Sequence, residues 1–325
     1  PAVCLMNCAH AMNASIPRRS NARARPVGMS NWATTIDRSR RVSAVTIPSR
    51  VELKRRVGPS DAPLLVDFLH QYAGLSKQQI KDAAAKGAVL LRRNGAVKRL
   101  RRAKAELHDG DHIELHYDRE ILARVPPPAR CVADRSLYSV WIKPAGMLAQ
   151  GTAFGDHCAL LRVAETAWQP ARPVWLVHRL DREACGLMVI AHTRSAAADL
   201  SRQFQRNAVR KRYRVQVRGD VTASCGAEGR IETPLDGKPA TTLYRVEQWD
   251  EECGISTLAV EIQSGRLHQI RRHLAGLGHP IVGDPRYGRD NKDAGGLRLA
   301  AVALTFRCPQ TRIPAEFTLA LTDSE

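Results

Sequence analysis

Several features that would define a class of protein are missing from this sequence. No stretch of the 325-residue chain stays apolar for the roughly 18 residues that a membrane-spanning helix needs. We therefore expect a soluble protein with no membrane partner. The eight cysteines include no C-x-x-C pair, and none has a histidine at the spacing of zinc ligands. This pattern predicts reduced thiols in an intracellular protein and no metal site.

Acidic residues are also scarce. Lys and Arg number 50 against 32 Asp and Glu, which gives a formal net charge of +18. Such an excess is typical of proteins that neutralise phosphates, so we expect a polyanionic partner, although a merely basic soluble protein would have the same charge. No acidic residue precedes Asp37, and residues 1–47 are predicted to be disordered. We expect a cytoplasmic protein, with a mitochondrial or other organelle matrix as the alternative because this composition also suits a transit segment.

Residues 48–118 have the pattern of a small basic α/β domain. Asp61 is predicted to cap a first helix that ends at Gly74, and Ser76 with Gln79 forms a capping-box signature for a helix over residues 77–86. Short strands are predicted at 88–91 and 113–117, with a turn at Asn94-Gly95. The pattern resembles the alpha-L RNA-binding domain of a ribosomal small-subunit protein. A generic basic subdomain is the alternative.

Residues 119–134, with three successive prolines at 126–128, are predicted to be a linker to a domain over residues 135–325. Strands are expected there at 137–142, 174–177, 186–191, 213–217, 258–262, 297–306 and 317–321, and helices at 195–205 and 267–277. Because several strands follow one another without an intervening helix, the fold class is predicted to be α+β with a mixed, mainly antiparallel sheet.

One charged segment between two apolar runs, H-R-L-D-R-E-A-C-G over residues 178–186, is the strongest candidate for chemistry. Arg179 and Arg182 flank Asp181 and would favour its ionised form, as a nucleophile requires. The local pattern alone also fits an ordinary structural ion pair.

The segment resembles the H-R-L-D-R-x-x-x-G loop of the RluA-type pseudouridine synthases, and three further blocks of that family follow the family's order. They are I-K-P-A-G-M at 142–147, K-R-Y at 211–213, and G-R-L-H-Q-I-R at 265–271, which continues through L-G-H-P-I-V-G-D at 277–284 to Tyr287-Gly288. The four blocks lie between about residues 137 and 306.

The resemblance implies an RNA-modifying isomerase that works without a cofactor or metal. It makes Asp181 the catalytic carboxylate and Arg271 the arginine that keeps the carboxylate ionised. It makes Tyr213 the tyrosine against the uracil face, where it can stack and help with the proton at carbon 5. Tyr213 could otherwise be a simple strand tyrosine. A target base must leave its stack to reach the carboxylate. Further candidates for binding the substrate are Arg179, Arg182, Arg266, His268 and Lys143. None of the three histidines at 178, 268 and 273 has acidic residues at the spacing of metal ligands. We expect these histidines to be packed in the core or to contact RNA.

The chain departs from the family pattern at four positions. Ala184 and Cys185 stand where the family has Thr-Ser, Leu267 replaces a Thr or Ser, and Ala300 replaces a histidine. The three presumed catalytic residues remain, so activity is expected. Ribosomal RNA, most of all from the large subunit, is the first substrate hypothesis and transfer RNA the second, and a monomer is expected. The alternative function outside the enzymes is that of an inactive RNA-binding ribosome-assembly factor.

Overall fold

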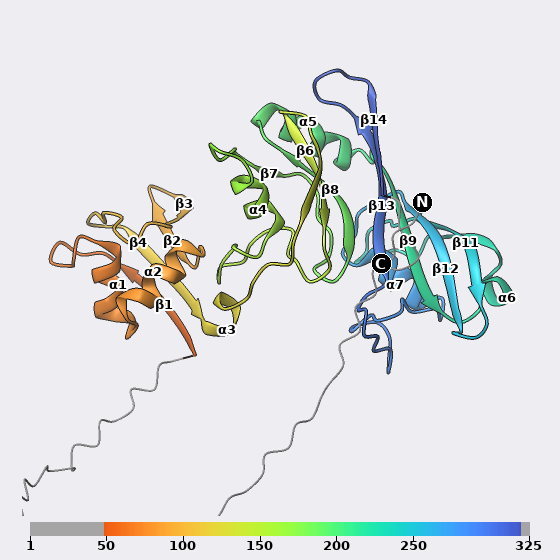
Figure 1. The fold of residues 1–325 in the computed structure, drawn as a ribbon, viewed down its shortest axis with the longest axis horizontal. Coiled ribbons are helices and arrows are strands. Elements are labelled where there is room, and N and C mark those ends of the chain that lie inside the picture. The colour runs from red at the N-terminus through yellow and green to blue at the C-terminus, as the bar shows by residue number, and fades with distance from the viewer. Residues whose placement is uncertain (1–48, 320–325) are drawn as a thin grey trace, which may run out of the picture. The chain divides into compact units, whose positions relative to one another are not determined.

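The computed structural model describes residues 49–319, so the segment predicted to be disordered, 1–47, lies outside the described residues. Within 49–319 no helix is both long and apolar enough to cross a membrane. Two separate sheets are present, one before and one after residue 120 (Figure 1).

The first sheet has four strands in the order β1-β4-β2-β3, with all pairs antiparallel. Its elements are β1 (Arg50–Arg56), α1 (Leu65–Ala73), α2 (Lys77–Ala85), β2 (Val89–Arg93), β3 (Ala96–Arg99) and β4 (His112–Asp118). The two helices bury Phe68, Leu69 and Ile80 against the sheet in a core of their own. Strand β1 was not predicted, because its apolar residues Val51 and Leu53 alternate only twice in a basic stretch.

The local signals of this segment were mostly confirmed. Ser76 and Gln79 form both bonds of the capping box, Gly74 ends α1 in a left-handed conformation, and Asn94 and Gly95 both have positive φ in the β2–β3 turn. The predicted cap by Asp61 was wrong: α1 begins after Leu64 without a side-chain cap. The Asp61 carboxylate instead accepts bonds from the Gly58 N–H and the Tyr72 hydroxyl, which ties the preceding turn to α1.

The second sheet has ten strands. Five helices lie in this part of the chain, and the first of them packs on the core of the first sheet through Leu122. The strands are β5 (Arg130–Asp134), β6 (Tyr138–Lys143), β7 (Trp175–Leu176), β8 (Cys185–Ala191), β9 (Arg210–Arg218), β10 (Glu228–Ile231), β11 (Thr242–Asp250), β12 (Ile255–Ile262), β13 (Leu299–Arg307) and β14 (Pro314–Thr318). The helices are α3 (Arg119–Leu122), α4 (Leu160–Thr166), α5 (Arg194–Gln205), α6 (Val221–Cys225) and α7 (Gln269–Gly276). The last five residues of the predicted linker thus form β5, which pairs with β6.

The main path through this sheet is β10-β11-β12-β9-β13-β8-β6-β5, with β14 added beside β13 and β7 beside β8. Only β8 and β13 pair in parallel; the other pairs are antiparallel. The prediction of an α+β fold with a mixed, mainly antiparallel sheet is confirmed.

The two faces of this sheet bury different side chains, as the two-residue period of strands requires. Trp141, Met188 and Ile190 belong to a core on one face that also includes side chains of α4, α7 and β9. Val140 and Val189, their neighbours in sequence, belong to the core on the other face, which α5 covers. Residues of β9, β11 and β12, among them Arg212, Arg245 and Glu261, line a cavity at the surface of the sheet.

Most predicted elements exist with shifted ends. Helix α5 begins one residue earlier than predicted, where the Thr193 hydroxyl accepts a bond from the Ala196 N–H. Helix α7 begins two residues later, at Gln269, because His268 has a left-handed backbone conformation that cannot belong to the helix. The strands β5, β10 and β11 were not predicted. Their alternation is interrupted by charged side chains such as those of Arg245 and Glu247.

Candidate active site

Asp181 lies in the loop between β7 and β8 and faces a cavity of about 190 Å³. Charged and polar side chains make up much of the cavity wall. The lining residues are Leu148, Ala149, Gln150, Arg179, Leu180, Asp181, Arg182, Glu183 and His268. Four of these, Arg179, Arg182, Asp181 and His268, were predicted from the sequence as site residues.

The partner of Asp181 is Arg271 on α7. Its Nη1 donates to Asp181 Oδ2 at 3.1 Å, although 90 residues separate the two in the chain. The Arg271 side chain is only 2% exposed. Its Nε and Nη2 donate to the two oxygens of the buried Asp284, each at 2.8 Å. One edge of the guanidinium is therefore fixed by one carboxylate, and the remaining Nη1 is directed at Asp181.

This arrangement determines the charges at the site. Burial by itself would lower the pKa of Arg271, but its bonds to Asp284 and Asp181 raise it, so the guanidinium stays charged. Burial likewise opposes ionisation of Asp284, yet the bonds from Arg271 and from the backbone N–H groups of Arg286 and Tyr287 hold the pKa of Asp284 below its usual range. A charged, immobile donor thus stands beside Asp181.

His268 stands on the other side of the Asp181 carboxylate. Its Nε2 is 3.8 Å from Asp181 Oδ1, and its Nδ1 is 3.0 Å from the Tyr287 hydroxyl. Oδ1 has no hydrogen-bond donor among residues 49–319, whereas Oδ2 is held by Arg271. One carboxylate oxygen is anchored, and the other is available to a molecule in the cavity.

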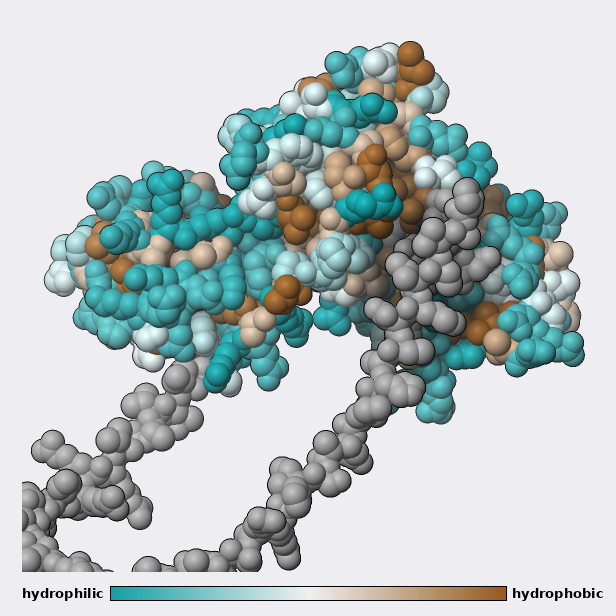
Figure 2. All heavy atoms as spheres, viewed as in Figure 1, coloured by the Kyte–Doolittle hydropathy of each residue, from teal (hydrophilic) through white to brown (hydrophobic). Residues whose placement is uncertain are grey.

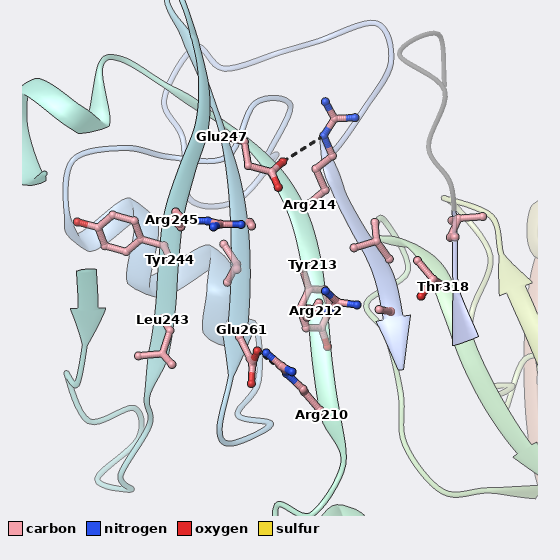
Figure 3. A pocket seen from close by; sticks show the side chains of 15 residues that line it. Arg210, Arg212, Tyr213, Arg214, Leu243, Tyr244, Arg245, Glu247, Glu261 and Thr318 are labelled. Atoms are coloured by element: carbon pink, nitrogen blue, oxygen red, sulfur yellow. Dashed lines mark hydrogen bonds and ion pairs between the residues drawn. The ribbon is translucent and has the colours of Figure 1, made fainter. Parts of the chain in front are cut away.

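Tyr213 is buried on the same face of β9 as the core around the Asp181 loop. Burial and the charge of Asp181 both raise the pKa of Tyr213, so its phenol keeps its proton. Its neighbours Arg212 and Arg214 point to the opposite face, where Arg210, Glu247 and Glu261 also lie (Figure 3). A larger cavity of about 600 Å³ is lined by these residues and also by Tyr213. Since most of those arginines pair with glutamates, that cavity has the character of an ordinary solvated sheet face.

The prediction that Lys143 binds substrate is corrected by its position. Its side chain is fully buried, and Nζ donates to the carbonyl oxygens of Pro144, Met147, Arg182 and Ala184. Burial lowers the pKa of Lys143 to about 8. An ammonium enclosed by backbone carbonyls has no surface for a substrate. Lys143 instead joins the turn after β6 to the loop that carries Asp181.

The other predicted substrate-binding residues are only partly brought together. Arg179 and Arg182 are exposed at the cavity, but no ion pair among residues 49–319 joins either to Asp181, and Arg182 pairs with Glu183. The arginine that contacts Asp181 is Arg271, as the resemblance implied, and not one of the two that flank it in sequence. Arg266 does not line the cavity; its Nε donates to the Pro239 carbonyl.

Two histidines are packed, as expected. His178 accepts a bond from the Val189 N–H, and burial lowers its pKa to about 3. The ring of His273 lies between Thr242 Oγ1 and the Thr233 carbonyl. Of the departures from the family pattern, Ala184 and Ala300 are buried while Leu267 is 54% exposed beside His268. Ala300 pairs with Cys185 where β13 meets β8.

The sequence analysis assigned no role to Asp284 or Tyr287. Both stand in the last quoted motif block, G-D followed by Tyr287-Gly288, so a signal was present. A lone acid after a glycine does not show which cation it will meet, because Arg271 lies on a separate element. The resulting site combines a carboxylate and an imidazole at a small cavity with a buried cation behind them, which suits nucleophilic and proton-transfer chemistry.

Comparison with known proteins gives a consistent set of relatives. Residues 137–276 match the family described as RNA pseudouridylate synthase. An uncharacterized RNA pseudouridine synthase of Aquifex aeolicus is 32% identical over 241 residues, covering 67% of this chain and 74% of that protein. The dual-specificity RNA pseudouridine synthase RluA of Vibrio parahaemolyticus is 33% identical over 205 residues, covering 54% of this chain and 78% of that protein.

Two further proteins extend this set. The ribosomal large subunit pseudouridine synthase D of Escherichia coli strain K12 is 28% identical over 271 residues, covering 77% of this chain and 78% of that protein. Among solved structures, human RNA pseudouridylate synthase domain containing 1 superposes with a TM-score of 0.50 at 21% identity, covering 59% of this chain and 83% of that one. This last likeness concerns the fold alone.

Proposed function

This chain belongs to the RluA-type family of RNA pseudouridine synthases, and on that premise we propose that it isomerises uridines in large-subunit ribosomal RNA with Asp181 as the nucleophile. The observation that supports the role of Asp181 is its geometry. Arg271 holds Oδ2 at 3.1 Å, and Oδ1 faces the cavity without a donor among the described residues.

The reaction requires little beyond these groups. The bond from the sugar C1′ to N1 of uracil breaks, the base turns, and C1′ joins C5, with one proton leaving C5 and one taken up at N1. The Asp181 carboxylate, held at Oδ2 by the charged and buried Arg271, can attack the sugar or the base. Tyr213, a neutral phenol, offers a flat surface on which a base can stack.

The test is release of tritium from RNA labelled at C5 of uridine, by the full chain and by its Asp181→Asn variant. We expect release that needs Asp181, with turnover at least about 10³-fold lower in the variant, since loss of a nucleophile costs on that order. Asp236→Asn is the control, because Asp236 is exposed and pairs with Arg272 outside the cavity. Undiminished release by Asp181→Asn would refute the nucleophile.

The substrate class is tested in the same assay with ribosomal and transfer RNA. Large-subunit ribosomal RNA is proposed because the Escherichia coli relative, over 77% of this chain, carries that substrate in its name. The Vibrio relative is named as dual-specificity, which keeps transfer RNA as the second candidate. The cytoplasm, where such RNA is found, stays the predicted compartment. Tight RNA binding without release from either RNA would favour the inactive assembly factor.

We further propose that residues 48–118 grip the RNA backbone. Exposed basic side chains without ion-pair partners among the described residues lie in β3 and just after it, such as those of Lys98, Arg102 and Lys104. In the space-filling view most of the visible surface of this segment is hydrophilic (Figure 2). Phosphate contacts of this kind position an RNA without reading its sequence.

A further inference from the structure

Leu267 is a large apolar side chain exposed next to the cavity at Asp181. It is 54% exposed and belongs to none of the three hydrophobic cores formed by residues 49–319. Single exposed leucines are common on proteins and need no explanation by themselves. The position of this one does need a reason, because it directly precedes His268, whose Nε2 is 3.8 Å from Asp181 Oδ1. Consecutive Cα atoms lie ~3.8 Å apart, so Leu267 stands within one residue of the cavity wall.

The turn that carries Leu267 is fixed by buried polar groups. The side chain of Gln269 is buried, and its Oε1 accepts bonds from the Ser264 hydroxyl at 2.7 Å and from the Arg266 N–H at 3.1 Å. Its Nε2 donates at 2.9 Å to a backbone carbonyl oxygen just before β11. His268 adds a left-handed backbone conformation, which residues with a side chain seldom adopt. The leucine is therefore held in solvent by a rigid turn.

The charges around this leucine indicate what kind of molecule would cover it. Arg179 and Arg182 line the neighbouring cavity, and both are exposed. Arg286 is exposed as well, and its guanidinium lies 5.7 Å from the centre of the Tyr287 ring, whose hydroxyl holds His268. An apolar contact surrounded by cations matches a nucleotide, because a base has uncharged faces and its phosphate is an anion.

We propose that Leu267 packs against the face of a base next to the target uridine in the RNA strand, an inference that rests on the proposed function. The target base must leave its stack to reach Asp181. Its departure exposes the faces of the bases on either side, and an apolar side chain can cover such a face. Leu267 is a positioning residue in this account. It holds the strand so that the target enters the cavity, and it takes no part in bond making or proton transfer.

The test uses Leu267→Asn, which replaces the apolar side chain by a polar one of similar size. The probe is a short synthetic RNA that contains the uridine located by tritium release. We expect affinity about tenfold lower in filter binding, since the loss of an apolar contact by a leucine has an effect of that order. The rate of single turnovers at saturating RNA should stay unchanged, because the contact is made equally before and during the reaction. The melting temperature should also stay unchanged, since the side chain is exposed.

RNAs that lack one base make the test specific. Two further probes lack the base on one or the other side of the target uridine and keep the sugar and the phosphate. Wild type should bind one of them about tenfold more weakly than the intact RNA, because the leucine loses its contact. Leu267→Asn should lose much less affinity for the same probe, since the effects of removing two groups that touch each other are not additive.

Two variants serve as controls. Leu267→Met should bind like wild type, because it keeps an apolar side chain of similar size. Ile313 is 65% exposed at the turn between β13 and β14 and does not line the cavity, so Ile313→Asn should bind all three RNAs like wild type.

Three results would overturn the proposal. Unchanged affinity in Leu267→Asn would leave a protein as the molecule that covers this side chain. Equal losses by Leu267→Asn and wild type on both base-lacking RNAs would show that no neighbouring base touches it. Slower single turnovers at saturating RNA with full affinity would place its effect on the reacting groups. Failure of wild type to release tritium from any RNA would instead refute the proposed function.

Discussion

At the scale of single residues, the site depends on one arginine shared by two acids. A guanidinium has five N–H donors in a rigid plane, and Asp284 occupies two of its three nitrogens from within the core. Arg271 therefore cannot turn away from Asp181 without breaking two charge-assisted bonds. Asp284 is a positioning residue in this view, since it acts on Asp181 only through Arg271.

Replacing Asp284 by Asn should damage both stability and turnover. Breaking a buried ion pair by removing one partner costs about 3 kcal/mol or more, because the other charge stays buried. We expect that loss in chemical denaturation, together with turnover at least about tenfold lower, as misplacing a catalytic group costs. Asp236→Asn again serves as control: Asp236 makes the same bidentate contact with the adjacent Arg272 on the surface, and its loss should leave both measurements nearly unchanged.

The stability difference should also depend on pH. Because the pKa of Asp284 is lower in the folded chain than in the unfolded one, its contribution is fully present above the unfolded value of about 3.9 and is lost as pH falls through the folded value. The unfolding free energies of wild type and Asp284→Asn should thus converge below about pH 4. A constant difference from pH 7 to pH 3 would contradict this account.

At the scale of elements, the parallel contact between β8 and β13 joins the two parts of the large sheet just after the Asp181 loop. Ala300 pairs with Cys185 and Ala301 with Gly186. Gly186 has a φ of 113°, and a Cβ there would collide with the backbone of Ala301. The glycine thus permits the close approach that sets where the loop ends.

Gly186→Ala should therefore lower the melting temperature and turnover together. A strained backbone conformation costs about 1–3 kcal/mol, and the collision with β13 adds to it. Gly276→Ala is the matched control: Gly276 is in α7, has no positive φ, and has open space where the methyl group would stand. That variant should be as stable as wild type or slightly more so, because alanine favours helices. Equal melting temperatures for the two variants would argue against the close contact.

The elements also show where sequence patterns suffice. The capping box at Ser76 and the Asn94-Gly95 turn were predicted because each depends on a few adjacent residues. The start of α7 was not, since the left-handed His268 is held by Tyr287 and faces Asp181, and both are distant in sequence. The cap by Asp61 failed for a related reason, as Tyr72 competes for that carboxylate.

At the scale of the whole molecule, the net charge of +18 should make RNA binding strongly dependent on salt. Because each phosphate contact releases counterions, the logarithm of the binding constant should fall linearly with the logarithm of the salt concentration. The proposal that residues 48–118 grip the backbone predicts that part of this slope originates there.

Neutralising Lys98, Arg102 and Lys104 together with glutamine should lower the slope by about 1 for each phosphate that is no longer neutralised, and it should weaken binding to different RNAs alike. The control is Arg210→Gln with Arg212→Gln on the far face of the large sheet (Figure 3), where each arginine already pairs with a glutamate. Filter binding from low to high salt measures both. An unchanged slope in the triple variant would exclude these residues from the RNA interface.

The sequence by itself determined the family and the fold class, and it predicted Asp181, Tyr213 and Arg271 as members of one site, because four motif blocks in a fixed order require no knowledge of distance. Only the tertiary structure decided which charge meets which. It left the two arginines that neighbour Asp181 without a contact to that carboxylate, buried Lys143 among carbonyls, and placed Asp284 and Tyr287 behind the site. Such pairings depend on packing between elements far apart in the chain, and local pattern carries no measure of that distance.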